Sequence, residues 1–427
     1  MIAVVLSAVL GASTAADAPL ILAEADALLS AGRLADAEAA LEPLASRGDP
    51  SALLRLSQVR RWSGRPIAAR EAALRALALA PDRRDVREEV AWTWVDAGRA
   101  APAMEVLDRA AAAASNQLVA RIGELRRASA SIGATAYSDN QGIARYAPRV
   151  RVDVPLWRDA RLSVGGGSTR LSQQEAEWSE GAGAEVAIPL DFIQLIGGAG
   201  VHRLSSGALL TEGHAALGLR PVDEFRVELR ARRRPFVEGV PILATELEAF
   251  HGAGVGGALD LAQVERRGVD ELRLEIAAQP FGGSWIYGVG RAFATSDHNT
   301  GWSTAVGAGL SVTRLLRARG PLEAALRWDS YLMGFSEPRT AYLSPRFLDA
   351  HSPGAELTLH LGSSCALSVE GGPTFSSDSA ALQGMGWFGG AGVEVALGRA
   401  KLGVRAQARR DPWFESTRAW TRFQIPF

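Results

Sequence analysis

The sequence lacks most of the residue patterns that carry enzyme chemistry. Cys365 is the only cysteine among 427 residues, so no disulfide can form within the chain and no cysteine-based metal site is available. The six histidines show no metal-ligand spacing. The glycine run Gly165–Ser168 has no following lysine, so it is no phosphate loop, and no nucleophile elbow is present. We therefore expect no enzyme, no metal and no cofactor.

The sequence also has a single lysine, almost no net charge and no long apolar run. Lys401 is the only lysine among 46 basic residues, and the net charge of −1 at pH 7 gives no general attraction to nucleic acid. No apolar run reaches the roughly 18 residues that a membrane-spanning helix needs. Any membrane insertion must therefore use a closed β-barrel, the other structure that satisfies every backbone group in lipid.

The chain divides into three parts by composition. Ile2–Leu10 is apolar and small residues follow it, which predicts an export signal over residues 1–16, with a buried first helix as the alternative. Residues 17–130 are rich in Ala, Leu, Arg and Glu at helical spacing. At Ser131 glycine becomes frequent and period-two alternation begins, so residues 131–427 are predicted to be strands.

The helical part contains an internal repeat. Gly64, Ala69 and Pro81 lie at the offsets of a tetratricopeptide unit, and Gly98 and Ala103 repeat the first two positions 34 residues later. Small residues at these offsets let paired helices approach closely, and glycine ends the first helix of a pair. The pattern predicts a short helical solenoid, closed by a helix over Gln117–Ala128, that either holds a protein partner or acts as a spacer.

The second half contains seventeen candidate strands. They are Ser131–Asp139, Arg145–Pro155, Ala160–Leu171, Glu177–Ile188, Asp191–Leu204, Ala208–Arg220, Asp223–Arg234, Gly254–Arg266, Val269–Gln279, Ser284–Thr295, Trp302–Leu315, Leu322–Met333, Gly354–Leu361, Cys365–Phe375, Trp387–Leu397, Ala400–Arg410 and Ser416–Phe427. Bacterial single-chain barrels have even strand numbers, so one candidate is wrong, and we expect an antiparallel barrel of 16 strands, or alternatively 18. Segments 235–250 and 332–351 are long enough for gating or surface loops.

Many of these strands have one apolar and one charged face. Arginine facing lipid at mid-bilayer costs about 2–4 kcal/mol, so the charged faces are predicted to line the lumen. The polar wall is read either as a path for a sugar polymer or as a salt-bridge lattice that only braces the barrel, and the arginine excess on Asp223–Arg234 favours an anionic or neutral polymer. The candidate path residues are Arg226, Glu228, Arg230, Arg232, Arg234, Arg273, Glu275, Arg327, Asp329, Tyr331, Arg405 and Arg409.

The last strand ends on aromatic and aliphatic residues. Phe423, Ile425 and Phe427 share one face of this strand, and Phe427 ends the sequence. This pattern resembles the C-terminal signal of bacterial outer-membrane barrels, which implies that lipid covers that face.

The order of signal, helical repeats and barrel resembles the outer-membrane porins that export cellulose and poly-N-acetylglucosamine. The segment Tyr342–Phe347 is similar to a Tyr-aromatic-Ser-Pro stretch of those barrels, with Leu343 departing from the aromatic, and Arg232–Pro235 is similar to their Arg-Pro step into a long loop. Arg60, Trp62, Gly64 and Arg65 resemble their repeat helices. One departure is the array of about three repeats, since the family often has many more.

The resemblance implies a monomeric outer-membrane channel that exports an exopolysaccharide. Its partners would be the polysaccharide chain, outer-membrane lipid and periplasmic synthesis or modification proteins held by the repeats, with the N-terminal part in the periplasm. A general diffusion porin or a surface scaffold, whose repeats bind an unrelated periplasmic partner, is the alternative. A barrel-embedded hydrolase built on paired lumenal carboxylates is a third hypothesis.

Overall fold

The computed structural model describes most of the chain as two units. The described residues are 18–107, 115–139, 144–172, 176–205, 207–235, 268–280, 283–295, 300–315, 320–337, 347–362, 364–378, 383–411 and 414–426. Unit 1 comprises residues 1–127 with Trp157–Asp159, and unit 2 comprises Ala128–Leu156 and Ala160–Phe427. The predicted export signal lies outside the described residues. None of the described helices is long and apolar enough to cross a membrane.

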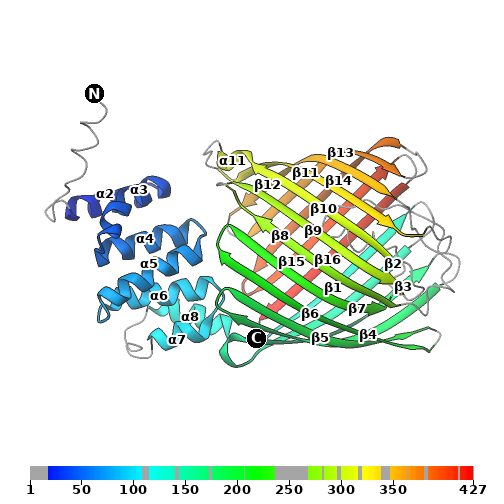
Figure 1. Cartoon of the computed structure of the whole chain (residues 1–427), viewed down its shortest axis with the longest axis horizontal. Helices are drawn as coiled ribbons and strands as arrows, with labels where there is room; N and C mark the ends of the chain where they lie inside the picture. The colour runs from blue at the N-terminus through cyan, green and yellow to red at the C-terminus, as the bar shows by residue number, and fades with distance from the viewer. Residues whose placement is uncertain are drawn as a thin grey trace. The chain divides into compact units, whose positions relative to one another are not determined.

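Unit 1 is a stack of antiparallel helices in which each helix packs against the next (Figure 1). The helices are α2 (Ala18–Ser30), α3 (Leu34–Ser46), α4 (Pro50–Trp62), α5 (Pro66–Leu79), α6 (Arg84–Asp96), α7 (Ala100–Leu107) and α8 (Asn116–Leu125). Asp159 belongs to this unit because its carboxylate accepts hydrogen bonds from the amides of Ala100 and Ala101, 2.8 Å each, and so caps α7.

The positions singled out by the repeat pattern have distinct structural roles. Gly64 and Gly98 end α4 and α6 with φ of +77° and +74°, a backbone conformation that residues with a Cβ adopt only at a cost. Ala69 and Ala103 are fully or almost fully buried between helices. Pro81 lies in the exposed turn between α5 and α6. Small residues therefore occupy the sites where the helices approach each other.

Two carboxylates, the half-buried Glu38 and the buried Glu89, join the helices of unit 1. Glu38 of α3 pairs with Arg60 at 3.0 Å and with Arg65. Burial alone would raise the pKa of Glu38, but the hydrogen bonds and charges of these two arginines together lower it. Glu89 of α6 accepts hydrogen bonds from Ser57 at 3.0 Å and Arg61 at 3.1 Å. Burial of Glu89 raises the pKa of this carboxyl by more than the nearby charge of Arg61 lowers it, so the pKa is raised.

Unit 2 is a closed antiparallel barrel of 16 strands, in which every strand pairs with its neighbours in the sequence and β1 pairs with β16. This confirms the predicted fold class. The strands are β1 (Ser129–Asp139), β2 (Ala144–Pro155), β3 (Arg161–Ser172), β4 (Ala176–Leu190), β5 (Ile193–Leu204), β6 (Leu209–Val222), β7 (Phe225–Pro235), β8 (Gly268–Ala278), β9 (Ser284–Thr295), β10 (Thr300–Ser311), β11 (Leu322–Phe335), β12 (Leu348–Leu361), β13 (Cys365–Asp378), β14 (Gln383–Leu397), β15 (Ala400–Asp411) and β16 (Phe414–Pro426).

Some of the predicted elements differ from the structure. The candidate strand at 254–266 lies outside the described residues, and the barrel closes without it because β7 pairs directly with β8. The predicted strand 302–315 ends at Ser311, and Val312–Leu315 forms the short helix α11. The predicted loop 332–351 is shorter, because β11 continues to Phe335 and β12 begins at Leu348. Of the other predicted loop, 235–250, only Pro235 is described.

The start of β12 was missed because Pro353 interrupts the strand pattern. Proline has no backbone N–H, so a sequence reading places the strand after it. In the structure β12 begins at Leu348, and its pairing with β13 is interrupted only between His351 and Ala355. The strand therefore passes through the proline with a local loss of ladder bonds.

The two rims of the barrel carry connections of different length. Ser129 pairs with Pro426, so β1 begins and β16 ends on the same rim. Tight connections at 191–192, 223–224 and 398–399 lie on this rim. The longest connections between strands, 236–267 and 336–347, lie on the opposite rim.

Candidate functional site in the barrel lumen

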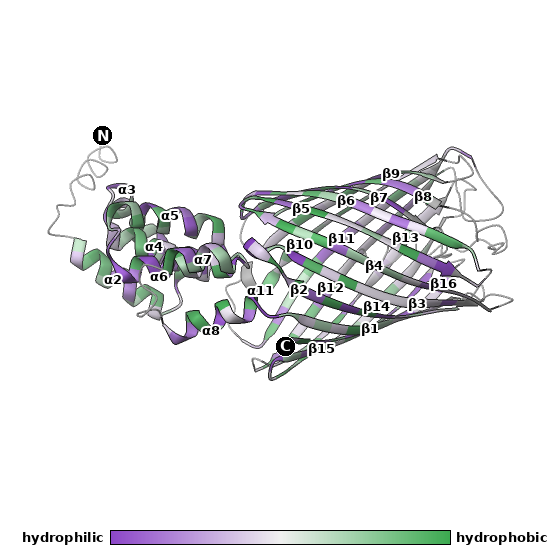
Figure 2. Ribbon diagram, turned by 90° about the horizontal axis from the view of Figure 1, so that it is seen from below, coloured by the Kyte–Doolittle hydropathy of each residue, from purple (hydrophilic) through white to green (hydrophobic). Residues whose placement is uncertain are grey.

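Hydrophobic and hydrophilic residues are interspersed along the strands of the barrel (Figure 2). Leu229 of β7, Leu274 of β8 and Leu326 of β11 are 43%, 41% and 55% exposed on the outer face. Their neighbours in sequence point the other way, where side chains from strands that are not adjacent reach one another. Side chains converge on the concave face of a closed barrel, which favours contacts that skip a strand, so the charged face lines the lumen.

The predicted path residues of β7 and β8 lie together on the inner face. Arg232 pairs with Glu271 at 2.9 Å, and the Glu271 side chain is fully buried. Arg230 pairs with Glu228 at 2.7 Å, and Arg273 pairs with Glu275. Arg226 is exposed at the start of β7, and the side chain of Arg234 is outside the described part. This patch is therefore largely neutralised by its own carboxylates.

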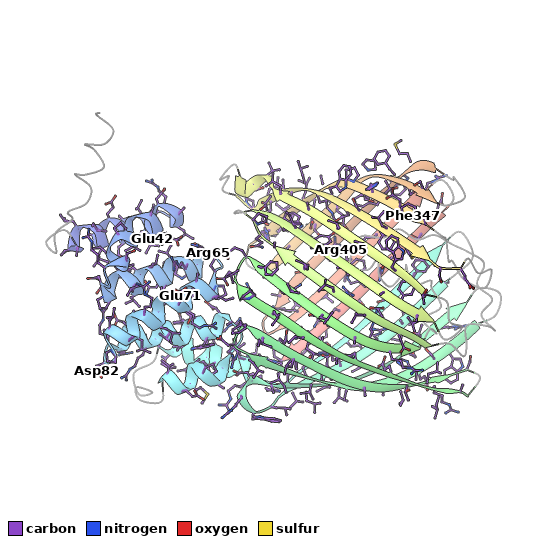
Figure 3. The ribbon with its side chains drawn as sticks, in the orientation of Figure 1. Glu42, Arg65, Glu71, Asp82, Phe347 and Arg405 are labelled. Carbon is purple, nitrogen blue, oxygen red and sulfur yellow. The ribbon has the colours of Figure 1, made fainter. Side chains whose placement is uncertain are left out.

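A second group joins β9, β11, β13 and β15. Glu370 accepts hydrogen bonds from Arg327 at 2.9 Å, Arg405 at 2.6 Å and Gln407 at 2.6 Å, and its side chain is only 2% exposed. Arg327 also contacts Asp329 at 2.6 Å, and Tyr287 donates to the same carboxylate. Arg405 lies midway along the wall (Figure 3). The side chains of four strands thus form one connected lattice.

The remaining predicted path residues are buried in this wall. Tyr331 is 5% exposed and its hydroxyl donates to the sulfur of Met333 at 3.4 Å. Arg409 of β15 is 6% exposed. These two residues brace the wall more than they face the open lumen.

Several lumen residues were not identified from sequence. Glu370 is the centre of the lattice, but it is the only charged residue of β13 before Asp378, so its strand showed no charged face. Glu185 of β4 meets the imidazole of His214 at 2.8 Å, and Glu212 of β6 meets that of His202 at 3.2 Å. The alternation of side chains along one strand does not show which residues of other strands will lie beside it, so these pairs could not be predicted from sequence. In the described part of the chain, no group of three or more His, Cys, Asp or Glu side chains could hold a metal.

Glycines let large lumen side chains lie flat against the wall. A Cβ at Gly181 would fall 2.4 Å from the His202 ring, and one at Gly307 would fall 2.1 Å from the Tyr287 ring. A Cβ at Gly309 would fall 1.9 Å from the Trp285 ring. The side chains of one strand therefore occupy the space over glycines of the next, which keeps the centre of the lumen open.

A cavity of about 920 Å³ lies on the side of the lumen formed by β16 and β1–β7. Its charged lining residues are Arg149, Arg151, Glu185, Glu212, Arg230, Arg232, Arg233, Arg418 and Arg422, together with His202 and His214, and Trp420 is the aromatic residue among them. Arg151 pairs with Asp153 at 2.7 Å and with Glu185 at 3.4 Å. Arginines outnumber carboxylates on the lining of this cavity.

The predicted C-terminal signal occupies the outer face of β16. Ile425 is 44% exposed, and Phe423 is half-buried on the same face. Phe427 lies outside the described residues. Of the segment 342–347 that carried part of the resemblance, only Phe347 is described, and it is exposed next to the start of β12.

Comparison with known proteins identifies the fold of unit 2. No protein-family model and no curated protein sequence matches the chain. A solved structure described as "Bacterial polysaccharide outer membrane secretin" is similar with a TM-score of 0.57 and 11% identity, covering 71% of this chain and 99% of that one. CdiB from Acinetobacter baumannii (TM-score 0.44, 8% identity, 70% of this chain and 60% of that one) and OccK1 from Pseudomonas aeruginosa (0.36, 9%, 70% and 99%) are also similar. The likeness to the secretin structure, with its TM-score of 0.57, shows that the barrel fold matches that of an outer-membrane protein.

Proposed function

We propose that the chain is an outer-membrane channel that passes an exopolysaccharide outward through the barrel lumen. The observation that carries this proposal is the closed 16-strand barrel with an apolar outer face and a charged inner face. Such a wall can stand in lipid and still offer hydrogen-bond partners to a hydrated polymer along the whole lumen. The likeness of its fold to a polysaccharide secretin supports a polymer as the cargo.

The lumen chemistry suits a sugar chain better than an apolar solute. Guanidinium and carboxylate groups can donate and accept hydrogen bonds with hydroxyl groups, and Trp285, Tyr287 and Trp420 offer aromatic faces to sugar rings. The Tyr287 ring occupies the space beside Gly307 on the inner wall of the barrel. These features support a path along which a polymer slides between many weak contacts.

The helical unit is proposed to recruit proteins that synthesise or modify the polymer. Its helices repeat with glycine turns at Gly64 and Gly98, and stacked helix pairs of this kind offer extended surfaces for protein partners. Short barrel connections on the rim where both strand termini lie, and long ones on the other, favour a periplasmic position for the N-terminal unit. We further propose that the barrel acts as a monomer.

Deletion of the gene tests the export function. We expect the surface polysaccharide to disappear while its intracellular precursor remains, and we expect the full-length chain to restore it. Staining of surface polymer and quantification of precursor are the measurements. Unchanged surface polymer together with altered uptake of small solutes would contradict export and favour a general diffusion porin. Turnover of sugar or lipid by the purified protein in detergent would instead favour the hydrolase hypothesis.

A further inference from the structure

We infer that the part of the lumen cavity beside β16 binds carboxylate-bearing sugar residues, so that the exported polymer is anionic. This inference deepens the proposed export function and rests on it. The proposed site consists of Arg149 of β2 with Arg418, Trp420 and Arg422 of β16, all of which line the cavity.

The first observation is the sign of the charges on three adjacent strands. The lumen-facing side chains of β15, β16 and β1 that the structure describes lie within Lys401–Arg409, Ser416–Gln424 and Ser129–Tyr137. They contain no carboxylate, whereas Lys401, Arg409, Arg418 and Arg422 are cationic. Arg405 of β15 is also cationic, but it is paired with Glu370 of β13 at 2.6 Å. A single-sign region in a low-dielectric wall raises the local concentration of ligands of opposite charge.

Elsewhere in the lumen, arginines are paired with carboxylates. Arg230 and Arg232 of β7 are matched by Glu228 and Glu271, and Arg327 lies between Asp329 and Glu370. Charges arranged this way neutralise each other and offer little attraction to an anion. The arginine excess on β7, which the sequence pattern emphasised, therefore does not make the anion site.

The second observation is the spacing of Arg422 and Arg149. Gly133 of β1 is directly paired with both of them, with Arg422 on one side and Arg149 on the other. Two strand spacings separate the backbones of the arginines by about 9–10 Å. Both side chains are exposed, and Gly133 places no side chain between them. The gap can accept one sugar ring with its carboxylate directed to either guanidinium.

Glycine also sets the position of Arg149. A Cβ at Gly167, its partner on β3, would lie 2.9 Å from Cγ of Arg149. The arginine stem therefore lies across the glycine and extends along the wall. The row across the wall is Gly403, Arg422, Gly133, Arg149 and Gly167.

The third observation is the aromatic ring next to this row. Trp420 is two residues from Arg422 and on the same face of β16, about 6–7 Å along the strand. The guanidinium carbons of Arg405 and Arg418 lie 5.6 and 5.5 Å from its ring centroid. A tryptophan face beside guanidinium groups matches the two features of a uronate, an apolar ring face and a carboxylate that accepts bidentate hydrogen bonds.

Block of single-channel conductance tests the inference with the full-length protein in a planar bilayer. The probes are an oligogalacturonate hexamer, which is anionic, and a neutral cello-oligosaccharide of the same length. We expect the anionic hexamer to block at a concentration about tenfold lower than the neutral hexamer needs, or lower still. The reason is that hydrogen bonds between charged groups contribute binding free energy of this size. We also expect anion selectivity in the reversal potential measured across a salt gradient.

Variants at the two arginines locate the effect. The double variant Arg149→Gln with Arg422→Gln is expected to weaken block by the anionic hexamer by about tenfold or more and leave block by the neutral one unchanged. Arg149→Lys with Arg422→Lys retains the charge and is expected to recover part of the block. Arg410→Gln removes an arginine that is 64% exposed on the outer face of the same barrel, and serves as the matched control.

The outcomes separate this inference from the export proposal. Equal block by both hexamers, or block by the anionic hexamer that the double variant does not change, would overturn the anionic assignment and leave polysaccharide export intact. Block by neither hexamer would contradict both. Heat-modifiable migration on gels, which reports a closed barrel, establishes that each variant is folded.

Discussion

At the residue scale, the lumen holds ionised groups in two different situations. Glu370 has three donors and almost no contact with water, whereas Arg422 is exposed to the cavity. A charge in the first situation is bound to the wall, and its removal strands its partners. A charge in the second situation remains available to a ligand. The same residue type therefore serves the stability of the wall or the chemistry of the path, depending on its partners.

Removing Glu370 is expected to destabilise the barrel. The variant Glu370→Ala leaves Arg327, which is 8% exposed, and Arg405 without this shared carboxylate, and should lower the unfolding free energy by about 3–5 kcal/mol. Equilibrium urea unfolding in lipid vesicles measures the effect. Glu415→Ala is the control, because its pair with Arg410 is largely exposed and should contribute at most about 1 kcal/mol. Similar losses in both variants would contradict the buried role of Glu370.

The paired carboxylates Glu38 and Glu89 of unit 1 are expected to give opposite dependences of stability on pH. The pKa of Glu89 is raised above its ordinary value of 4.5 by burial, so the folded protein binds more protons than the unfolded chain just above pH 4.5. The stability contribution of Glu89 is therefore lost as pH rises through its folded pKa. Glu89→Gln should raise stability at pH 7 and remove this slope, as measured by chemical denaturation followed by far-ultraviolet circular dichroism.

Glu38 provides the comparison within the same unit. Its pKa is lowered in the folded protein, so its contribution is present above pH 4.5 and is lost as the pH falls through the folded pKa. Glu38→Gln should therefore lower stability at pH 7, the reverse of the Glu89 variant. If both substitutions changed stability in the same direction at pH 7, the assignment of the two pKa shifts would be wrong.

At the scale of the element, small and large side chains lie beside each other on neighbouring strands of the inner wall. Lumen-facing glycines on β3–β5 and β10 lie next to rings and long side chains of the neighbouring strand. A residue with a Cβ at such a position would push the neighbour into the channel. The glycine content of the second half is thus explained by lateral packing of side chains along the inner wall, as well as by turns.

A methyl group at Gly307 is expected to disturb β9 and β10. Gly307→Ala places a Cβ within 2.1 Å of the Tyr287 ring, which must leave the wall and lose its hydrogen bond to Asp329. We expect a loss of about 1–3 kcal/mol of unfolding free energy from overpacking. Gly288→Ala is the matched control, because no heavy atom lies within 4 Å of a Cβ there. Urea unfolding with equal midpoints for the two variants would argue against this packing.

At the scale of the whole molecule, closure of the sheet sorts every side chain of unit 2 into one of two environments. Because the 16 strands form a ring without edges, one face points outward and the other into the lumen. In the proposed outer-membrane setting the outer face would contact lipid and the inner face water. A substitution then has a cost that depends on its face and on its depth along the strand.

An arginine on the outer face is expected to have a depth-dependent cost. Leu274 is 41% exposed near the middle of β8, and Leu274→Arg should destabilise the barrel by about 2–4 kcal/mol. Leu397 is 55% exposed at the end of β14, and Leu397→Arg should cost about 1 kcal/mol or less. Urea unfolding in lipid vesicles gives both values. Equal costs at the two depths would be inconsistent with a membrane-embedded outer face.

The sequence alone allowed the fold class, the strand number and the alternation of faces to be predicted. These features could be predicted because period-two alternation is visible within each short segment of the sequence. The even strand number follows from closing an antiparallel sheet into a barrel. The candidate strand at 254–266 lies outside the described residues, and the barrel closes without it. The start of β12 was predicted too late, at Gly354 and not Leu348, since a proline carries the same local signal inside and outside a sheet. The pairs His214–Glu185 and Arg405–Glu370 were not predictable, because they join residues 29 and 35 positions apart through the register of the strands.

Local patterning determined that many strands have one apolar and one charged face, and that residues 17–130 are helical. Only the tertiary structure decided which charges cancel. Strand register brings Glu370 to Arg327 and Arg405, and brings Arg422 and Arg149 to either side of Gly133. The reason is physical: alternation fixes the side to which a residue points, whereas its electrostatic partners depend on which residues the neighbouring strands place at the same height.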